Sequence, residues 1–192
     1  MYRLIGAFLY LSLWSVCWAQ AMVPVPEGFV LQRLEETDGQ IAKPKDWFYL
    51  RRGTPTGWVW ILSKEDPELG PFQTGMLIQV LVGVEKGTGG TREAFAQKVL
   101  ASKRSSAQVV GGCPKVDQGM FFRECVEVIE SVQRPEKSGI YRTRYSSFWG
   151  KEMDIVVFST FSAPNDAWAE AGPIADVMAN FVLIGPNFGK SK

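Results

Sequence analysis

The chain of 192 residues carries 21 lysines and arginines against 20 aspartates and glutamates, and 46% of its residues are hydrophobic. This length and composition fit one globular domain with a sizeable core. The small net charge gives no electrostatic case for binding nucleic acid or an anionic membrane. The sequence contains no histidine, which excludes His-based catalytic triads, histidine general bases and histidine-ligated metals.

The first residues have the features of a secretory signal peptide. Arg3 forms a short basic region, an apolar run follows from Leu4 to Val16, and small residues precede a cleavage point after Ala19 or Ala21. We therefore predict a signal peptide over residues 1–21 and a secreted or periplasmic protein. A membrane anchor is the weaker alternative, because the run is short of the ~20 residues of a span. Lipid attachment at Cys17 is disfavoured by the bulky residue before it.

Cleavage would remove the charge of Arg3 and leave a neutral mature chain. No other segment is apolar enough to span a bilayer, so we expect a soluble protein. We expect a single domain over residues 22–184 and a frayed tail over 185–192. Two cysteines, Cys113 and Cys125, remain, and a pair this close in an oxidising compartment predicts a disulfide.

A short strand is expected at residues 29–34, and a β-hairpin follows over residues 47–62. Its two aromatic and β-branched runs, 47–52 and 58–62, are separated by a five-residue loop, Gly53 to Gly57. A pairing of Arg52 with Trp58 groups Phe48, Leu50, Trp60 and Leu62 on one face and Trp47, Tyr49, Val59 and Ile61 on the other. A hairpin that is apolar on both faces is covered on both, or is covered on one and binds with the other.

A strong strand at residues 76–84 leads into a glycine-rich break, Gly87 to Thr91, and a helix over residues 92–105 capped by Thr91. We expect the inward side of this helix to carry Ala94, Phe95, Val99 and Leu100. Glycines between a strand and a helix let main-chain N–H groups approach an anion. The third glycine of G-x-G-x-x-G is replaced by Arg92, however, and a plain connection is the favoured interpretation.

Four further strands are expected at residues 108–116, 121–131, 140–148 and 154–161, the last of them apolar enough for a central position. The first two meet near Asp117-Gln118-Gly119, and the length of that loop decides whether Cys113 and Cys125 share a face. An odd loop places them on one face, and an even loop places them on opposite faces. Glycine at the end of a three-residue loop favours the odd loop, and Pro114 can add a bulge that adjusts the approach.

The last helix is expected to begin at Asn165 or Asp166, with Trp168 in its first turn and an interruption at Gly172-Pro173. Its apolar stripe is Ile174, Val177, Met178 and Phe181, and we expect Trp168 to pack beneath it against the sheet. The order of strands, helix, strands and helix predicts the α+β class, with helices packed on an antiparallel sheet.

The element order, together with single aromatic residues, resembles the PsbP-like family, which includes the PsbP subunit of photosystem II, a Ran-binding nuclear import factor and DcrB-like bacterial envelope proteins. The resemblance covers residues 28–184 and is carried by Lys45-Asp46-Trp47, by the strand, helix and four-strand run that follow, and by Trp168 with Phe181-Val182-Leu183. It implies an antiparallel β-sheet sandwiched by α-helices and a binding rather than a catalytic role. No residue matches a photosystem- or Ran-binding surface, and no histidine serves the metal contacts of some members.

Few residues indicate a site. Arg51 and Arg52 beside Trp58 would form a cation–π cluster that grips a carboxylate, although such arginines more often keep a sheet edge soluble. Arg142 and Arg144 alternate with tyrosines, a pattern typical of a solvated strand face. The motifs G-x-S-x-G and S-x-x-K are absent from the sequence. We therefore predict no catalytic residue, no metal ligand and no cofactor.

The sequence predicts a secreted or periplasmic, non-enzymatic binding module that acts on a protein partner as an assembly factor, an adaptor or an immunity-type inhibitor. The alternative is an envelope hydrolase or a small-ligand carrier that uses the sheet face. A deep pocket with convergent serine, lysine or carboxylate side chains would favour the alternative. A shallow surface with exposed aromatic residues would favour the binding module.

Overall fold

The computed structural model describes residues 25–134, 137–185 and 188. Its centre is a seven-stranded antiparallel sheet in the order β3-β4-β5-β9-β8-β7-β6. The strands of this sheet are β3 (Phe48–Thr54), β4 (Gly57–Ser63), β5 (Gly75–Val82), β6 (Gln108–Gln118), β7 (Phe121–Arg134), β8 (Lys137–Gly150) and β9 (Ile155–Pro164). A separate hairpin pairs β1 (Phe29–Leu34) with β2 (Gly39–Pro44) across a short 3-10 turn, η1 (Glu35–Thr37).

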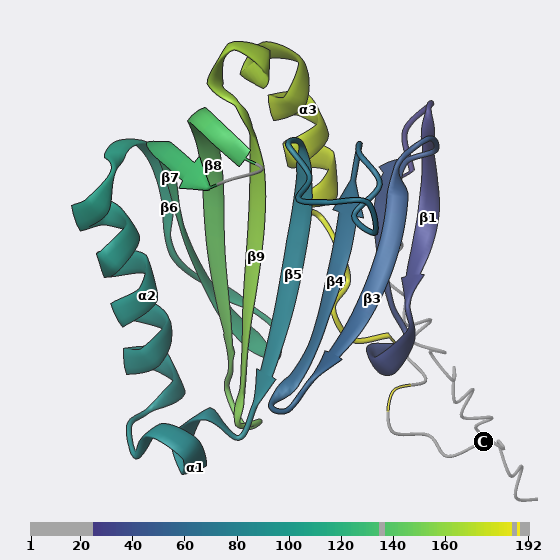
Figure 1. Ribbon diagram of the computed structural model, residues 1–192. Helices are drawn as coiled ribbons and strands as arrows, with labels where there is room; N and C mark the ends of the chain where they lie inside the picture. The colour runs from purple at the N-terminus through teal and green to yellow at the C-terminus, as the bar shows by residue number, and fades with distance from the viewer. Residues whose placement is uncertain (1–24, 135–136, 186–187, 189–192) are drawn as a thin grey trace, which may run out of the picture.

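The helices lie on both faces of the sheet. They are α1 (Val84–Thr88), α2 (Arg92–Ser106) and α3 (Trp168–Met178), the last preceded by the 3-10 turn η2 (Asn165–Ala167). In Figure 1, α2 runs beside the β6–β8 end of the sheet, while α3 and the β1–β2 hairpin lie toward the other side. This arrangement confirms the predicted α+β class, an antiparallel sheet sandwiched by helices.

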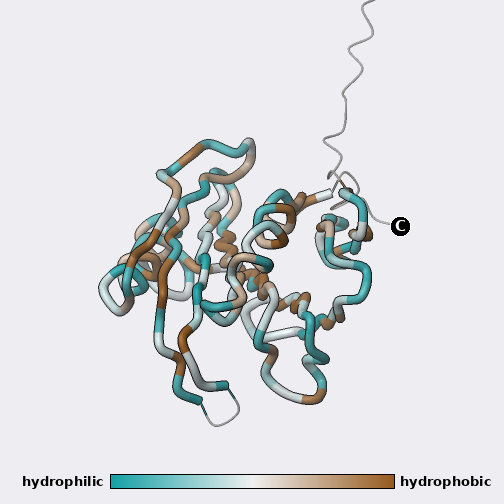
Figure 2. The backbone as a smooth tube through the Cα atoms, turned by 90° about the horizontal axis from the view of Figure 1, so that it is seen from above, coloured by the Kyte–Doolittle hydropathy of each residue, from teal (hydrophilic) through white to brown (hydrophobic). Residues whose placement is uncertain are grey.

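The larger core fills the space between the sheet, α3 and the β1–β2 hairpin. It includes the fully buried Trp60, Ile78 and Phe161, with Met178 from α3. A smaller core beneath α2 joins Leu100 to β7. Seen from above, hydrophobic residues of the strands gather at the middle of the molecule (Figure 2). Burial of this apolar surface on both faces is the main stabilisation of such a sheet.

Helix α2 begins where the sequence predicts, because the Thr91 side chain accepts a hydrogen bond from the Ala94 N–H at 3.1 Å. Leu100 is buried and Phe95 and Val99 are half-buried, as expected, but Ala94 is exposed and Ala96 takes the inward position. The prediction for Ala94 was wrong because residues two positions apart in a helix, such as Ala94 and Ala96, are separated by about 200° around the axis. Ala96 and Leu100, four residues apart, share one side.

Helix α3 is continuous through Pro173, so the predicted interruption was wrong. Proline removes one main-chain hydrogen bond from a helix, but residues on both sides of Pro173 are buried against the core, including Ala171 and Ala175. The packing of Trp168 was predicted correctly. Its side chain is 9% exposed and meets the ring of Phe161 edge-on at 6.0 Å.

The β3–β4 hairpin has a register one residue away from the predicted one. The turn is only Pro55-Thr56, and Thr54 pairs with Gly57. Gly57 has φ 153°, and a Cβ there would lie 2.0 Å from the Val80 carbonyl oxygen, so only glycine fits. A one-residue shift exchanges the faces of one strand relative to the other. The predicted grouping was therefore wrong: one face carries Tyr49, Arg51, Trp58, Trp60 and Leu62, and the other carries Phe48, Leu50, Arg52, Val59 and Ile61.

The two cysteines form a disulfide, although the length of the β6–β7 turn alone would place them on opposite faces of the sheet. The β6–β7 turn is the even Gly119-Met120, since Gln118 pairs with Phe121, so the predicted odd loop was wrong. A bulge between Cys113 and Val116 then shifts the register by one residue. Cys113 consequently lies opposite Cys125, with a Cα–Cα distance of 4.9 Å, and the two are bonded.

The ends of the chain are described only in part. The predicted signal peptide, residues 1–21, lies outside the described residues, as does most of the predicted tail. Gly185, where that tail would begin, is buried, and its N–H donates to the Thr37 carbonyl at 2.9 Å. Within the described ranges, no helix has the length and apolarity that a membrane crossing requires.

Candidate functional site

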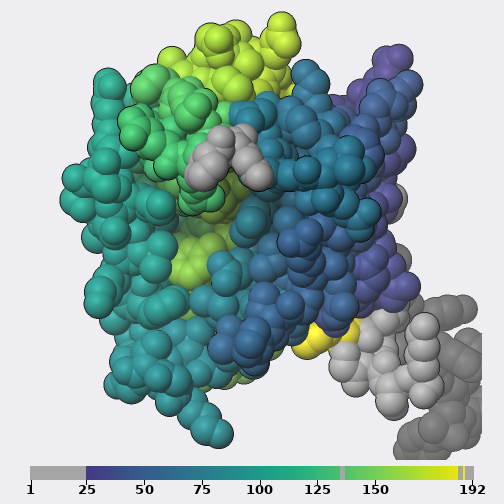
Figure 3. Space-filling model, viewed as in Figure 1, coloured from purple at the N-terminus to yellow at the C-terminus, as the bar shows by residue number. Residues whose placement is uncertain are grey.

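A cleft of about 340 Å³ opens on the sheet face that carries α2. In Figure 3 it is the hollow between α2 (teal) and the loop before β5 (blue), with β9 (yellow-green) at its bottom. The residues that line it come from six segments: Pro71, Phe72, Leu77, Lys103, Glu130, Val132, Arg134, Lys137, Tyr141, Thr143, Tyr145, Thr160 and Ser162. Its size is that of a small-ligand or side-chain pocket.

Lys137, at the start of β8, places a half-buried ammonium group in this cleft. Its Nζ donates to the Phe72 carbonyl at 3.0 Å and to the Ser162 hydroxyl at 3.3 Å. It also lies over the rings of Tyr141 and Phe72, at 4.4 and 5.1 Å from their centroids. Burial, with Arg134 nearby, lowers the pKa of Lys137 despite the opposing influence of Glu65 and Glu130.

The ammonium group of Lys137 has only neutral hydrogen-bond acceptors in this part of the chain. No carboxylate of a described residue lies within 4.0 Å of it. A partly desolvated cation without a directly bonded counter-charge is unfavourable. A carboxylate brought by a ligand would supply the missing charge-assisted hydrogen bond.

The side of the cleft formed by α2 and β7 is held by a second polar group. The Tyr145 hydroxyl donates to Glu130 Oε1 at 2.6 Å, and Lys103 Nζ lies 4.5 Å above the Tyr145 ring. Burial and this hydrogen bond raise the pKa of Tyr145, so its hydroxyl stays protonated. Glu130 is thereby occupied by Tyr145, and the aromatic wall of the cleft is fixed in place.

An apolar row extends the cleft across the sheet. Leu50 pairs with Ile61, Ile61 with Leu77, and Leu77 with Thr160 in the cleft. These residues share the face that carries Lys137, and the three aliphatic ones are half-buried. Helix α2 packs on β7, β8 and β9, and Figure 1 draws it away from β3 and β4. The outer face of the β3–β4 hairpin is therefore an accessible apolar surface continuous with the cleft.

The similarity of this chain to known proteins is confined to solved structures. No protein-family model matches it, and no curated protein matches it. One similar structure is the Ran-binding protein Mog1p of Saccharomyces cerevisiae, 13% identical, with 83% of this chain and 97% of that chain covered and a TM-score of 0.49. Another is cyanobacterial PsbP of Synechocystis sp. PCC 6803, 9% identical, with 85% and 97% covered and a TM-score of 0.45.

A third similar structure is a protein of Bacteroides thetaiotaomicron VPI-5482, 13% identical over 78% of this chain, with a TM-score of 0.44. This chain spans 46% of that protein. These similar structures include a PsbP protein and a Ran-binding protein, the kinds of protein that the resemblance in the sequence names. At 9–13% identity and TM-scores of 0.44–0.49, these likenesses assign no functional residue to this chain.

The predicted surface of Arg51, Arg52 and Trp58 does not come together as one cluster. Arg52 lies on the face opposite to Arg51 and Trp58, because Arg52 pairs with Val59. Arg51 forms an ion pair with Glu36, and Trp58 is half-buried edge-on to Trp60 at 5.8 Å. Among the described contacts, neither arginine lies over the Trp58 ring, and a binding role of these three residues stays an untested prediction.

The arginines of β8 belong to the framework. Arg142 and Arg144 both bond to the buried Glu127, and Arg144 also bonds to Asp176 of α3 at 2.6 Å. Their guanidinium carbons lie 5.0 and 6.0 Å from the Trp168 ring. These arginines therefore face the α3 core and fix α3 to the sheet, instead of forming a solvated strand face.

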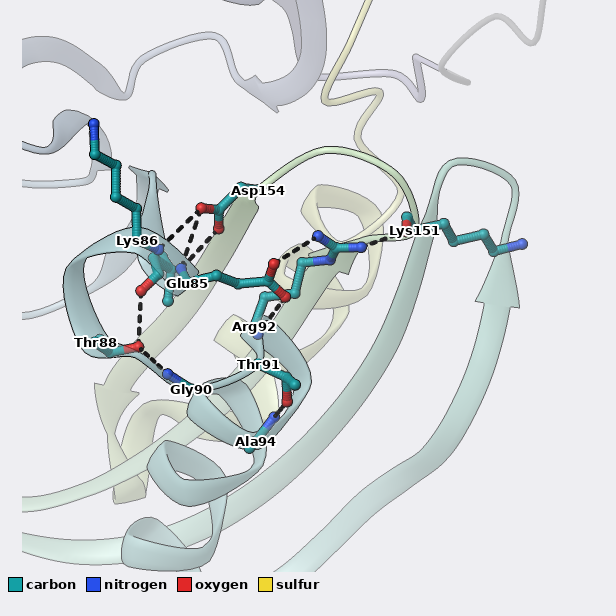
Figure 4. A network of polar contacts seen from close by, with 10 residues as sticks. Glu85, Lys86, Thr88, Gly90, Thr91, Arg92, Ala94, Lys151 and Asp154 are labelled. Carbon is teal, nitrogen blue, oxygen red and sulfur yellow. Dashed lines mark hydrogen bonds and ion pairs between the residues drawn. The ribbon is translucent and has the colours of Figure 1, made fainter.

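The glycine-rich connection is filled by side chains of the protein itself (Figure 4). Asp154 accepts from the Glu85 and Lys86 N–H groups at the start of α1, and Glu85 accepts from the Arg92 N–H at 3.2 Å. The Gly90 N–H donates to the Thr88 hydroxyl at 3.3 Å. The main-chain donors that an anion would need are thus occupied by Asp154, Glu85 and Thr88. The interpretation as a plain connection is the one that fits this geometry.

Sequence reasoning missed the cleft. Lys137 lies between the strands predicted at 121–131 and 140–148, whereas β7 and β8 extend to Arg134 and Lys137. Its partners Phe72 and Ser162 are 65 and 25 residues away in sequence. No local motif could have joined them, and the usable signal was a strand boundary. In the described part of the chain, no group of three or more Cys, Asp or Glu side chains could hold a metal ion.

Proposed function

We propose that this chain is a secreted or periplasmic, non-enzymatic binding module, formed by residues 22–184, whose cleft at Lys137 receives a carboxylate-bearing apolar segment of a protein partner. The observation that carries the proposal is the half-buried Lys137 ammonium group, bonded only to the neutral acceptors Phe72 and Ser162 among the described residues. Its aromatic surroundings match an apolar ligand that ends in one negative charge.

The apolar row Leu50–Ile61–Leu77 supports a protein segment over a small molecule as the ligand. A ligand confined to the cleft would leave this row uncovered. An extended segment could place its carboxylate at Lys137 and its side chains along the row, and exposed apolar surface of this kind is typical of protein-binding faces.

The ligand chemistry is tested by calorimetry with the acetylated tripeptide Leu-Ile-Phe, bearing either a free carboxylate or a C-terminal amide. We expect the carboxylate form to bind about tenfold or more tightly than the amide, because a charge-assisted hydrogen bond is worth this much. Lys137→Gln should abolish the difference. The matched control is Lys64→Gln, an exposed lysine that should leave it unchanged. Equal affinity for both peptides would refute the carboxylate site.

The protein partner is tested by placing a photo-crosslinking phenylalanine analogue at Phe72, which lines the cleft. A second variant carries it at Leu69, on the same loop and 88% exposed. We expect one crosslinked protein from the Phe72 position, lost when Lys137→Gln is added. Products that are the same from both positions, or that persist with Lys137→Gln, would contradict a partner bound in the cleft.

The compartment is tested separately. A fusion of residues 1–25 to a reporter active only outside the cytoplasm should be active, because this segment has the pattern of a signal peptide. Retention of Met1 on the purified native protein would contradict export.

The frayed tail over 185–192 is tested by limited proteolysis, which should remove it without loss of the folded domain.

A hydrolase is the second candidate, favoured by the contact between the Ser162 hydroxyl and Lys137 Nζ at 3.3 Å. A lysine with a lowered pKa is suited to activate a serine. Ser162 lies in β9, however, which pairs with β5 and β8 on both sides, so its main-chain N–H groups are engaged in the sheet rather than available to an oxyanion. A fluorophosphonate probe should leave Ser162 unlabelled. Labelling that Ser162→Ala removes would favour the hydrolase.

A further inference from the structure

Arg123 on β7 is a second cation whose charge is not compensated within the described chain. It forms no ion pair or side-chain hydrogen bond with any described residue, and its Nε is buried without a partner. Its guanidinium carbon lies 5.6 Å from the centroid of the Phe148 ring. Burial, followed by the nearby Arg144, lowers the pKa of Arg123, although an arginine stays protonated at any ordinary pH.

The neighbouring arginines show that this sheet face can supply carboxylates where it needs them. Arg142 and Arg144 lie on the same face and share Glu127, and Arg144 has Asp176 in addition. Arg123, two strand positions before Cys125, has neither acid within ion-pairing distance. The five N–H donors of a guanidinium form a planar fork that matches a carboxylate.

A pocket of about 370 Å³ opens beside Arg123. Its walls are the β6–β7 turn, the start of β7, Phe148 and the segment that follows α3, with Phe181 and Leu183 among its apolar residues. The Phe181 ring meets Phe148 edge-on at 5.4 Å. The segment after α3 is held to β2, because Val182 and Gln40 exchange two main-chain hydrogen bonds of 2.8 Å.

We infer that this pocket binds a single-chain amphiphile with a carboxylate head group, such as a medium-chain fatty acid. The carboxylate would bond to the guanidinium fork of Arg123, and the chain would lie against Phe121, Phe181 and Leu183. Charge complementarity selects the head group, since no acid of the described residues forms an ion pair with Arg123. The pocket also exposes polar groups, and the apolar side chains on its wall, Phe121, Phe181 and Leu183, select the chain. The site is independent of the cleft at Lys137, because Lys137 and Arg123 occupy opposite faces of the sheet.

The test is a titration of the purified, disulfide-bonded full chain with decanoate, methyl decanoate and acetate, followed by calorimetry. We expect decanoate to bind at least tenfold more tightly than either of the others, since methyl decanoate lacks the charge and acetate lacks the chain. Arg123→Gln should reduce decanoate binding to the level of methyl decanoate. Arg123→Lys, which keeps the charge and loses the fork, should retain part of the preference.

The matched control is Arg52→Gln, an exposed arginine of β3, which should leave decanoate binding unchanged. Equal binding of decanoate and methyl decanoate would overturn the inference. So would decanoate binding that survives Arg123→Gln, or that is lost equally in Lys137→Gln. If Arg123 served only to stack on Phe148, no variant would change the affinity ratio between the two decanoyl compounds.

Discussion

The arginines of β8 and the lysine of the cleft lie on opposite faces of the central sheet and differ in their partners. On the face covered by α3, Glu127 is 7% exposed and joins Arg142 and Arg144, and Asp176 adds a second acid for Arg144. On the face shared by α2 and the cleft, Lys137 donates to a carbonyl and a hydroxyl without an acid from the described chain. The first arrangement ties a helix to the sheet, and the second is the observation on which the proposed carboxylate site rests.

In a protein without catalytic motifs, this difference distinguishes a cation of the framework from a candidate binding residue. A buried ion pair whose acid is supplied by the protein is framework, because removing either partner leaves an uncompensated charge. A half-buried cation without such an acid is unfavourable until a ligand arrives. Arg123 follows the second pattern on the α3 face, at the point where α3 has ended and residues 179–184 form the cover.

If Arg142 and Arg144 are framework residues, the α3 core that they contact must be rigidly packed. Trp168→Ala removes a side chain that is 9% exposed and that contacts Phe161 and the two arginines. We expect the free energy of unfolding to fall by about 3–5 kcal/mol, measured by urea denaturation. A change within experimental error would show that this side of the sheet does not depend on Trp168.

The disulfide is expected to have the next largest effect. Replacing Cys113 and Cys125 together by serine should lower the free energy of unfolding by roughly 2–3 kcal/mol, because the bond closes a short loop. Thiol alkylation of the denatured, unreduced native protein should modify neither cysteine. Two modified cysteines in each mature chain would contradict the bond and weaken the case for an oxidising compartment.

A direct contrast between the two kinds of cation comes from Glu127→Gln and Arg123→Gln. The first leaves Arg142 and Arg144, whose side chains are 31% and 21% exposed, without their shared acid. We expect a loss of about 2 kcal/mol, less than for fully buried pairs because water partly screens these arginines. Arg123→Gln breaks no ion pair and should leave stability equal or higher. A larger loss for Arg123→Gln would reverse the assignment of the two patterns.

The smallest expected effect is a pH dependence at Lys137. Burial holds the pKa of this lysine below its ordinary value of 10.5 in the folded state. Between the folded pKa and 10.5 the unfolded chain binds more protons, so stability rises with pH in that window. The difference in unfolding free energy between the native protein and Lys137→Gln should therefore move in favour of the native protein as pH rises through it. A constant difference would mean that Lys137 is solvated.

The features that could be predicted from the sequence are those that depend on residues close together in the chain. Thr91 fixes the start of α2 through its own side chain, and the alternation of residues 76–80 assigns the buried face of β5, since Met76, Ile78 and Val80 are in the core. The predicted strand over 76–84 was too long, because β5 ends at Val82, which is 45% exposed. The order of elements was enough for the α+β class. Trp168 was placed correctly because an apolar side chain in the first turn of an amphipathic helix has one direction in which to be buried.

The register of the hairpins and the position of the cleft could not be predicted from the sequence and are seen only in the tertiary structure. One residue of loop length reverses a strand face. The sequence does not specify whether Thr54 belongs to the strand, or whether the bulge beside Pro114 offsets the even turn at Gly119. The cleft requires Phe72, Lys137 and Ser162 from three separate segments to meet. Their meeting depends on the strand order β5-β9-β8, which long-range packing fixes and local pattern does not.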